Sequence, residues 1–128
     1  MKKLRKGDNV ELQIESLAFG GLGVAKHDEQ VIFVRGAIPG QKVITAITRK
    51  KKSYLEGLAL ETLSESPNFI NPECNHFKYC GGCVHQNLTY AEQLKEKQAQ
   101  VENIFQRMGK YKDLKINPII GCENIWNY

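Results

Sequence analysis

The first half of this sequence predicts a small, mostly β fold, and two observations carry that prediction. Val10, Leu12 and Ile14 alternate with polar residues, which is the period of a strand with one buried face. Glycine and proline then interrupt the chain at short intervals up to residue 62, and no helical period appears between them. Five short strands within about 55 residues favour a small closed barrel of the oligonucleotide-binding type over an open sandwich, which would bury less surface.

The remaining strands of this barrel are predicted in order along the chain. "FGGLGVAKH" begins with a glycine turn and leads into a short strand, and "QVIFVRG" is an apolar run of strand length. After the turn "GAIPGQ", residues 42–62 predict two further strands that join near residues 51–53. We expect Phe19 to be the last core residue before the glycine turn rather than a platform for stacking. The turn lacks the Lys-Ser/Thr pair of a phosphate-binding loop.

The second half of the sequence has a different pattern. "LSESPNFINPEC" contains two prolines and predicts a linker over residues 63–72. A cysteine-rich loop over 74–83 precedes a helix predicted over about residues 89–108, for which Thr89 and Glu92 form a capping box. We expect a strand around residues 114–120. The apolar stripe predicted on the helix consists of Leu94, Val101, Ile104, Phe105 and Met108.

Composition and the N-terminus together predict a cytoplasmic protein that is not attached to a membrane. The chain is 41% hydrophobic and 25% charged, which is ordinary for a globular protein. No apolar run approaches the roughly 20 residues of a membrane span, and no apolar segment of a signal peptide follows the basic N-terminus.

Positive charge is concentrated in the first half of the chain. Residues 1–62 hold 11 Lys/Arg against 7 Asp/Glu, whereas residues 63–128 hold 7 of each kind, so we expect the first half to meet a polyanion. "RKKKSY" combines cations for phosphates with a ring on which a base can stack. The alternative is a solvated hairpin tip whose lysines keep a strand edge from pairing with another chain. The candidate RNA-binding residues are Arg49, Lys50, Lys51, Lys52 and Tyr54.

Three cysteines stand close together in the segment "CNHFKYCGGC". In a reducing cytoplasm such a cluster favours metal binding over disulfides. Cys74, Cys80 and Cys83 suit three irons of a cubane cluster, because each thiolate binds one iron. A zinc ion held by the three thiolates and either His76 or His85 is the alternative that the spacing leaves open, and three buried free thiols are another.

Several segments in the same order resemble one protein family. "IESLAFGGLGVAK", "VIFVRGAIPGQKV", "ITRKKKSYLEG", "CNHFKYCGGCVHQNLTYAEQLKEKQAQV" and "NPIIGCENIWNY" are together similar to the N-terminal part of bacterial uracil-5-methyltransferases of 23S ribosomal RNA. The resemblance implies an oligonucleotide-binding-like TRAM domain, a central domain with a four-cysteine [4Fe-4S] cluster, and a C-terminal Rossmann-like domain for methyl transfer from S-adenosylmethionine.

The resemblance assigns residues 1–62 to the TRAM barrel and residues 73–128 to an incomplete central domain. It places the fourth cluster ligand in a later segment, so we expect Cys122 to be a small, partly buried residue. The methyl-donor site and catalytic residues also belong to later segments, so we expect these 128 residues alone to be inactive. We also expect the full enzyme to be a monomer. The expected partner is RNA, with 23S rRNA as substrate.

Two other functions stay open. One is a stand-alone TRAM-type RNA-binding module with a structural zinc or iron-sulfur site. The other is an interaction scaffold that uses the helix stripe.

Overall fold

The structure is a computed structural model that describes residues 3–111 and 113–126. The chain forms two compact units, Met1–Thr89 and Tyr90–Tyr128. The predicted linker and the cysteine loop both lie in the first unit. Within the described residues, no helix combines the length and the apolar character that a membrane span requires.

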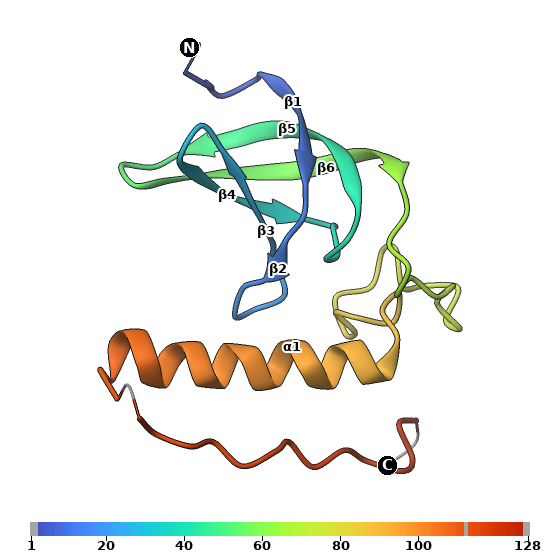
Figure 1. Ribbon diagram of the computed structural model, residues 1–128. Helices are drawn as coiled ribbons and strands as arrows, with labels where there is room; N and C mark the ends of the chain where they lie inside the picture. The colour runs from blue at the N-terminus through green and yellow to red at the C-terminus, as the bar shows by residue number, and fades with distance from the viewer. Residues whose placement is uncertain (1–2, 112, 127–128) are drawn as a thin grey trace. The chain divides into compact units, whose positions relative to one another are not determined.

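The first unit is built on one six-stranded sheet (Figure 1). Its strands pair in the order β1-β5-β6-β4-β3-β2, and every pair is antiparallel except β4 with β6. The strands are β1 (Asn9–Gln13), β2 (Ser16–Leu17), β3 (Gly23–His27), β4 (Gln30–Arg35), β5 (Lys42–Lys50) and β6 (Tyr54–Ser64). The five predicted strands are therefore confirmed, and the predicted mostly β, barrel-type fold with them.

The sheet differs from the prediction at its edges. β2 was not predicted, because two residues are too few to produce an alternation. The expectation of a closed barrel is wrong, since β1 and β2 are the edges of the ladder and are not paired with each other among the described residues. Only Ile14 and Glu15 separate these edges in the chain; the Ile14 amide donates to Gln41 O and the Glu15 amide to Val24 O, at 2.9 and 2.8 Å. The segment formed by Ile14 and Glu15 therefore connects the two edge strands, and its two amides form hydrogen bonds on the β1 side and on the β2 side of the sheet.

The core of the sheet follows from the alternation of its strands. Side chains at every second position point inward, as in β4, where Ile32 and Val34 are buried and Phe33 is half-buried. Each large side chain moved from water into this core contributes about 1.5–3 kcal/mol. The buried cluster consists of Leu4, Leu12, Ile14, Ala25, Ile32, Val34, Ala37, Val43, Ile47 and Leu55.

A second, smaller cluster joins the sheet to the base of the cysteine loop. Leu17 and Ile38 pack with Leu88, and Phe69 packs against this group. Phe69 and Leu88 also form an antiparallel bridge, which closes the loop at its base. The cysteine loop is therefore anchored to the sheet by apolar contacts at the base.

The second unit contains the predicted helix. It comprises α1 (Tyr90–Asn103) and a π-helical last turn, η1 (Ile104–Met108), and it stops before Gly109. The predicted strand around residues 114–120 is absent from the described part of this unit. Residues 117–122 are held by single hydrogen bonds instead: Gln98 Nε2 donates to Asn117 O at 3.2 Å, and the Cys122 amide donates to the Tyr90 hydroxyl at 2.8 Å.

Candidate nucleic-acid interface and cysteine loop

The predicted basic residues lie at the tip of the β5–β6 hairpin. The ladder runs up to the pairing of Lys50 with Leu55, and the Lys51 amide donates to Tyr54 O at 2.9 Å across the turn. Arg49, Lys50, Lys51 and Lys52 are all exposed. After a register shift between Ile47 and Arg49, the hairpin presents four cations to solvent from adjacent backbone positions.

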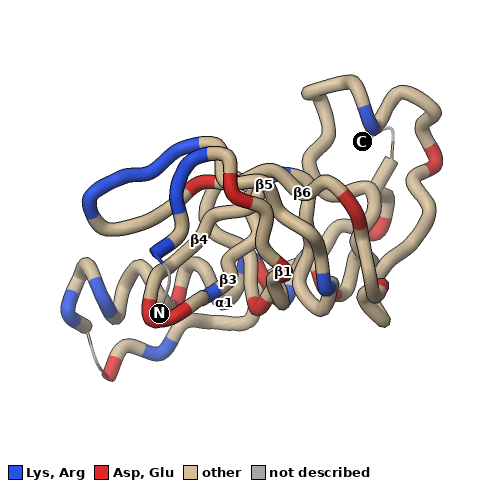
Figure 2. The backbone as a smooth tube through the Cα atoms, turned by 90° about the horizontal axis from the view of Figure 1, so that it is seen from above, with Lys and Arg blue, Asp and Glu red and all other residues tan. Residues whose placement is uncertain are grey.

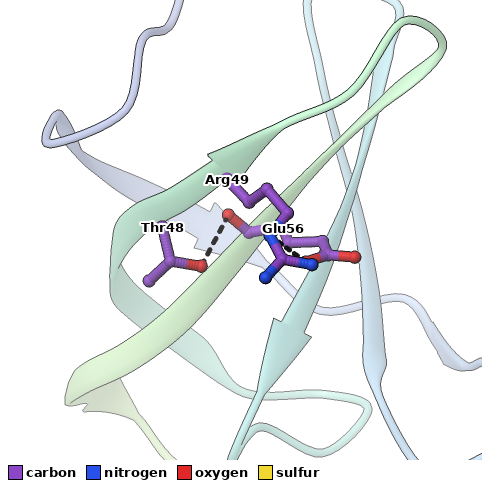
Figure 3. A network of polar contacts seen from close by, with 3 residues as sticks. All are labelled: Thr48, Arg49 and Glu56. Atoms are coloured by element: carbon purple, nitrogen blue, oxygen red, sulfur yellow. Dashed lines mark hydrogen bonds and ion pairs between the residues drawn. The ribbon is translucent and has the colours of Figure 1, made fainter.

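One of these cations has an acidic neighbour. Arg49 Nε lies 3.7 Å from Glu56 Oε2, and Thr48 Oγ1 donates to Glu56 O at 3.2 Å (Figure 3). The Arg49 side chain is 63% exposed, and exposed ion pairs contribute only about 0–1 kcal/mol. Arg49 can therefore exchange this carboxylate for a phosphate at little cost.

The N-terminal segment adds further cations beside the tip. The Gly7 amide donates to Ile47 O and the Ile47 amide donates to Asp8 O, each at 2.8 Å, which places residues 3–6 along the end of β5 that leads to the tip. Leu4 is buried in the core and anchors this segment. Figure 2 shows the basic residues of the N-terminus beside those of the hairpin tip. The "basic surface" is Lys3, Arg5, Lys6, Arg49, Lys50, Lys51 and Lys52.

The sequence did not place the N-terminal cations on any face, because their position depends on hydrogen bonds to a strand about 40 residues away. Lys2 lies outside the described residues. Two other basic residues lie away from the tip. Lys42 is at the opposite end of β5, where its Nζ pairs with Glu11 Oε1 at 2.7 Å, and Arg35 ends β4 opposite Leu58.

Tyr54 lies on the outer face of the sheet but is only partly accessible. Its ring packs edge to face against Phe33, with ring centroids 5.2 Å apart and an interplanar angle of 75°. Phe33 was not singled out from the sequence, since the unbroken apolar run of β4 concealed which residues face outward. The pair gives the outer face an aromatic patch at the end of β6 that starts from the basic tip.

The prediction that Phe19 belongs to the core is wrong. Phe19 is 83% exposed, and Leu17 is the last buried residue before the turn. The turn is closed by two hydrogen bonds, from the Ala18 amide to Leu22 O at 2.7 Å and from the Gly21 amide to Ala18 O at 3.0 Å. The strand therefore ends two residues before Phe19, whose ring extends into solvent.

The three clustered cysteines are exposed and free of disulfides. Short turns shape their loop: the Phe77 amide donates to Cys74 O, and the Cys80 amide donates to His76 O at 2.7 Å. The thiols suit an iron-sulfur cluster chemically. In the described residues, however, no three Cys, His, Asp or Glu side chains are gathered so that they could hold a metal ion. The donor types fit a cluster, whereas the conformation of the loop does not bring the donors together.

Cys122 is exposed too, so the expectation of partial burial is wrong. It lies in the second unit, where its Sγ is 3.0 Å from Asn124 O. Among the candidate alternative ligands, His76 is exposed and His85 is half-buried.

Comparison with known proteins identifies a domain family in the first unit. Residues 3–60 match the family model of the TRAM domain. This part of the chain is a TRAM domain. The TRAM domain therefore contains all six strands except the end of β6, and it carries the whole basic surface together with the Phe33–Tyr54 pair and Phe19.

The similarity to known proteins extends beyond the TRAM domain to nearly the whole chain. An uncharacterized RNA methyltransferase of Halalkalibacterium halodurans is 37% identical over 125 residues, which is 98% of this chain and 27% of that protein. The 23S rRNA (uracil(1939)-C(5))-methyltransferase RlmD of Alkalilimnicola ehrlichii is 37% identical over 92% of this chain and 26% of its own length. The same enzyme of Aeromonas hydrophila is 32% identical over 96% of this chain and 28% of its own length. The chain thus spans about a quarter of the length of these relatives, and the predicted resemblance to RNA methyltransferases is confirmed.

Proposed function

We propose that this chain is the RNA-binding region of an RNA methyltransferase that modifies 23S rRNA at carbon 5 of uracil. The observation that carries the proposal is the basic surface, which the hairpin tip and the N-terminal segment form together within the TRAM domain. The names of the relatives supply the substrate class and the reaction. S-adenosylmethionine would donate the methyl group in the full-length protein.

The basic surface suits the backbone of a single strand. Its cations are exposed, so each can move to meet a phosphate and release the counterions that surround RNA. Arg49 has only a weak ion pair to give up, and the three lysines of the tip extend from a paired hairpin. Tyr54 and Phe33 lie at the base of this tip and offer apolar surface to the bases.

The test is the salt dependence of RNA binding. The variant replaces Arg49, Lys50, Lys51 and Lys52 with Gln in the whole chain, and the probe is a single-stranded, uridine-rich RNA of about 12 nucleotides. Each phosphate contact contributes about 0.7 to the slope of log affinity against log salt, so loss of all four lowers the slope by about 2.8.

A matched control removes the same charge from the other unit. Lys95, Lys97, Arg107 and Lys115 are exposed there. Replacing these four with Gln should leave the slope close to that of the unmodified chain. If both variants lower the slope equally, binding follows net charge and the proposed surface is wrong. If the unmodified chain does not bind the RNA, the proposed function itself fails.

We further propose that Cys74, Cys80 and Cys83 ligate a [4Fe-4S] cluster, which would fix the loop rather than take part in methyl transfer. The three cysteines are exposed and form no disulfides, which supports this proposal. The apolar contacts at the base of the loop would hold the ends of a cluster-binding loop in place. Cluster binding would require the loop to draw its three thiols together.

Anaerobic purification tests the cluster. We expect iron and acid-labile sulfide to accompany the chain, to be lost on Cys80→Ser and to be retained on Cys122→Ser. Stoichiometric zinc without sulfide would contradict the proposal in favour of the zinc site.

A further inference from the structure

Phe19 is an exposed aromatic residue that none of the roles described above explains. Its ring is 83% exposed, whereas the neighbouring Leu17 is buried. An apolar ring of this size gains about 1.5–3 kcal/mol on burial, so leaving it in water forgoes stability. Single exposed apolar residues are common on protein surfaces, so exposure alone does not indicate a function. The backbone that carries this ring distinguishes it.

The turn that carries Phe19 is held by backbone hydrogen bonds and by apolar packing at its beginning. Gly20 and Gly21 have φ angles of +98° and +91°, which other residues rarely adopt, and two backbone hydrogen bonds close the turn. Leu17 anchors its beginning in the small apolar cluster with Ile38 and Leu88. The ring is therefore uncovered while the backbone beneath it is fixed.

The glycine turn also packs against the end of the cysteine loop. A Cβ at Gly21 would overlap Val84 Cγ1 and would lie 3.3 Å from His85 Cε1. Only glycine allows this approach, because both the space and the backbone angle exclude a side chain. Figure 1 shows the turn between β2 and β3 next to this part of the chain. The same loop carries the exposed Lys78 and the 86% exposed ring of Tyr79.

We propose that Phe19 is a base-stacking residue for single-stranded RNA, held in place by the contact of the glycine turn with the cysteine loop. This inference rests on the proposed function. A rigid turn lowers the entropy lost when the ring orders against a base, and base stacking needs an accessible ring face, which Tyr54 in its edge-to-face pair offers less freely. The ring would complement the basic surface by contacting bases instead of phosphates.

The experiment compares three substitutions at one position in the whole chain. Phe19→Ala and Phe19→Leu remove the aromatic face, and Leu keeps most of the apolar area, whereas Phe19→Trp keeps a stacking face. The probe is the same single-stranded RNA, with 2-aminopurine at single positions to report stacking through its fluorescence. Met108→Ala is the control, because Met108 is 80% exposed and lies in the other unit.

We expect Phe19→Ala and Phe19→Leu to bind about 5- to 150-fold more weakly, which corresponds to the loss of one base stack. The salt slope should stay unchanged, because no phosphate contact is lost. Phe19→Trp and Met108→Ala should bind like the unmodified chain, and the quenching of 2-aminopurine at one position should disappear in the Ala and Leu variants only.

Three results would overturn the stacking role. Wild-type affinity and quenching in Phe19→Leu would show that the aromatic face is not used. Loss of binding in the hairpin-tip variant with none in Phe19→Ala would refute stacking by Phe19 while leaving the proposed function intact. An unmodified chain that does not bind RNA would overturn the proposed function and the stacking role together.

Discussion

The two units of the chain differ in how they bury apolar side chains. The sheet encloses a cluster of ten buried residues, contributed by five of its strands, the segments between them and the N-terminal segment. None of the described residues of α1 or η1 is buried, and Val101, Ile104 and Phe105 on the helix stripe are exposed. The sheet therefore carries its own stability, whereas the helix depends on its backbone hydrogen bonds and on the segment that follows it.

The difference also separates the candidate functions. The sheet unit presents its cations and aromatic rings on a backbone fixed by a core, so its surface is preorganised for a ligand. The helix presents apolar residues on a backbone without such support. The proposed RNA binding therefore belongs to the sheet unit, and we propose no function for the helix.

The largest predicted effect contrasts a matched pair of isoleucines. Ile32 is fully buried in β4, and Ile104 is 42% exposed in η1. Ile32→Ala should lower the free energy of unfolding of the sheet by about 2–5 kcal/mol, because it removes methyl groups from the core and leaves a cavity. Ile104→Ala should change it by less than about 0.5 kcal/mol. Urea denaturation followed by circular dichroism measures both, and equal losses would mean that the two units fold as one.

A smaller effect is predicted at the β3–β4 hairpin. Asp28 and Glu29 occupy left-handed backbone conformations, with φ of 47° and 68°, where glycine is preferred. Glu29→Gly should raise the free energy of unfolding of the sheet by about 0.5–1 kcal/mol, since the left-handed conformation costs other residues about 1–2 kcal/mol and glycine loses more entropy on folding.

The matched substitution in the helix should act in the opposite direction. Glu102→Gly removes the acceptor of the Gln98 side chain and places glycine inside α1, so it should lower helix content at a cost of about 1 kcal/mol. Circular dichroism and thermal denaturation measure both variants. A destabilised Glu29→Gly variant would show that the hairpin is not strained.

The sequence was sufficient to predict most of the strands, but it was insufficient to predict which residues lie together on the surface. Alternation at Val10, Leu12 and Ile14 and the turn residues after each strand are local, so they predicted the sheet. β2 was missed because its two residues carry no period. The barrel-type fold of the sheet could be predicted from the sequence. Whether the strand ladder closes into a barrel could not, because closure depends on pairing between distant segments.

The errors in the candidate site have the same cause. Phe19 was expected in the core and Cys122 was expected to be partly buried, but burial depends on which segment passes over a residue, and none of the described segments covers either of them. The cations of the N-terminus could not be placed, because the pairing of Gly7 and Asp8 with Ile47 is a tertiary contact. The roles predicted for Arg49–Lys52, for Tyr54 and for the three clustered cysteines stay predictions.

The salt dependence of RNA binding tests the central claim, namely that the TRAM domain binds RNA through its basic surface. Binding of the single-stranded RNA is measured at several salt concentrations for the unmodified chain, for the variant at residues 49–52 and for the control variant at Lys95, Lys97, Arg107 and Lys115. The claim predicts that the slope of log affinity against log salt decreases only in the variant at residues 49–52, by about 0.7 for each phosphate contact removed. The same slope for all three proteins would contradict it.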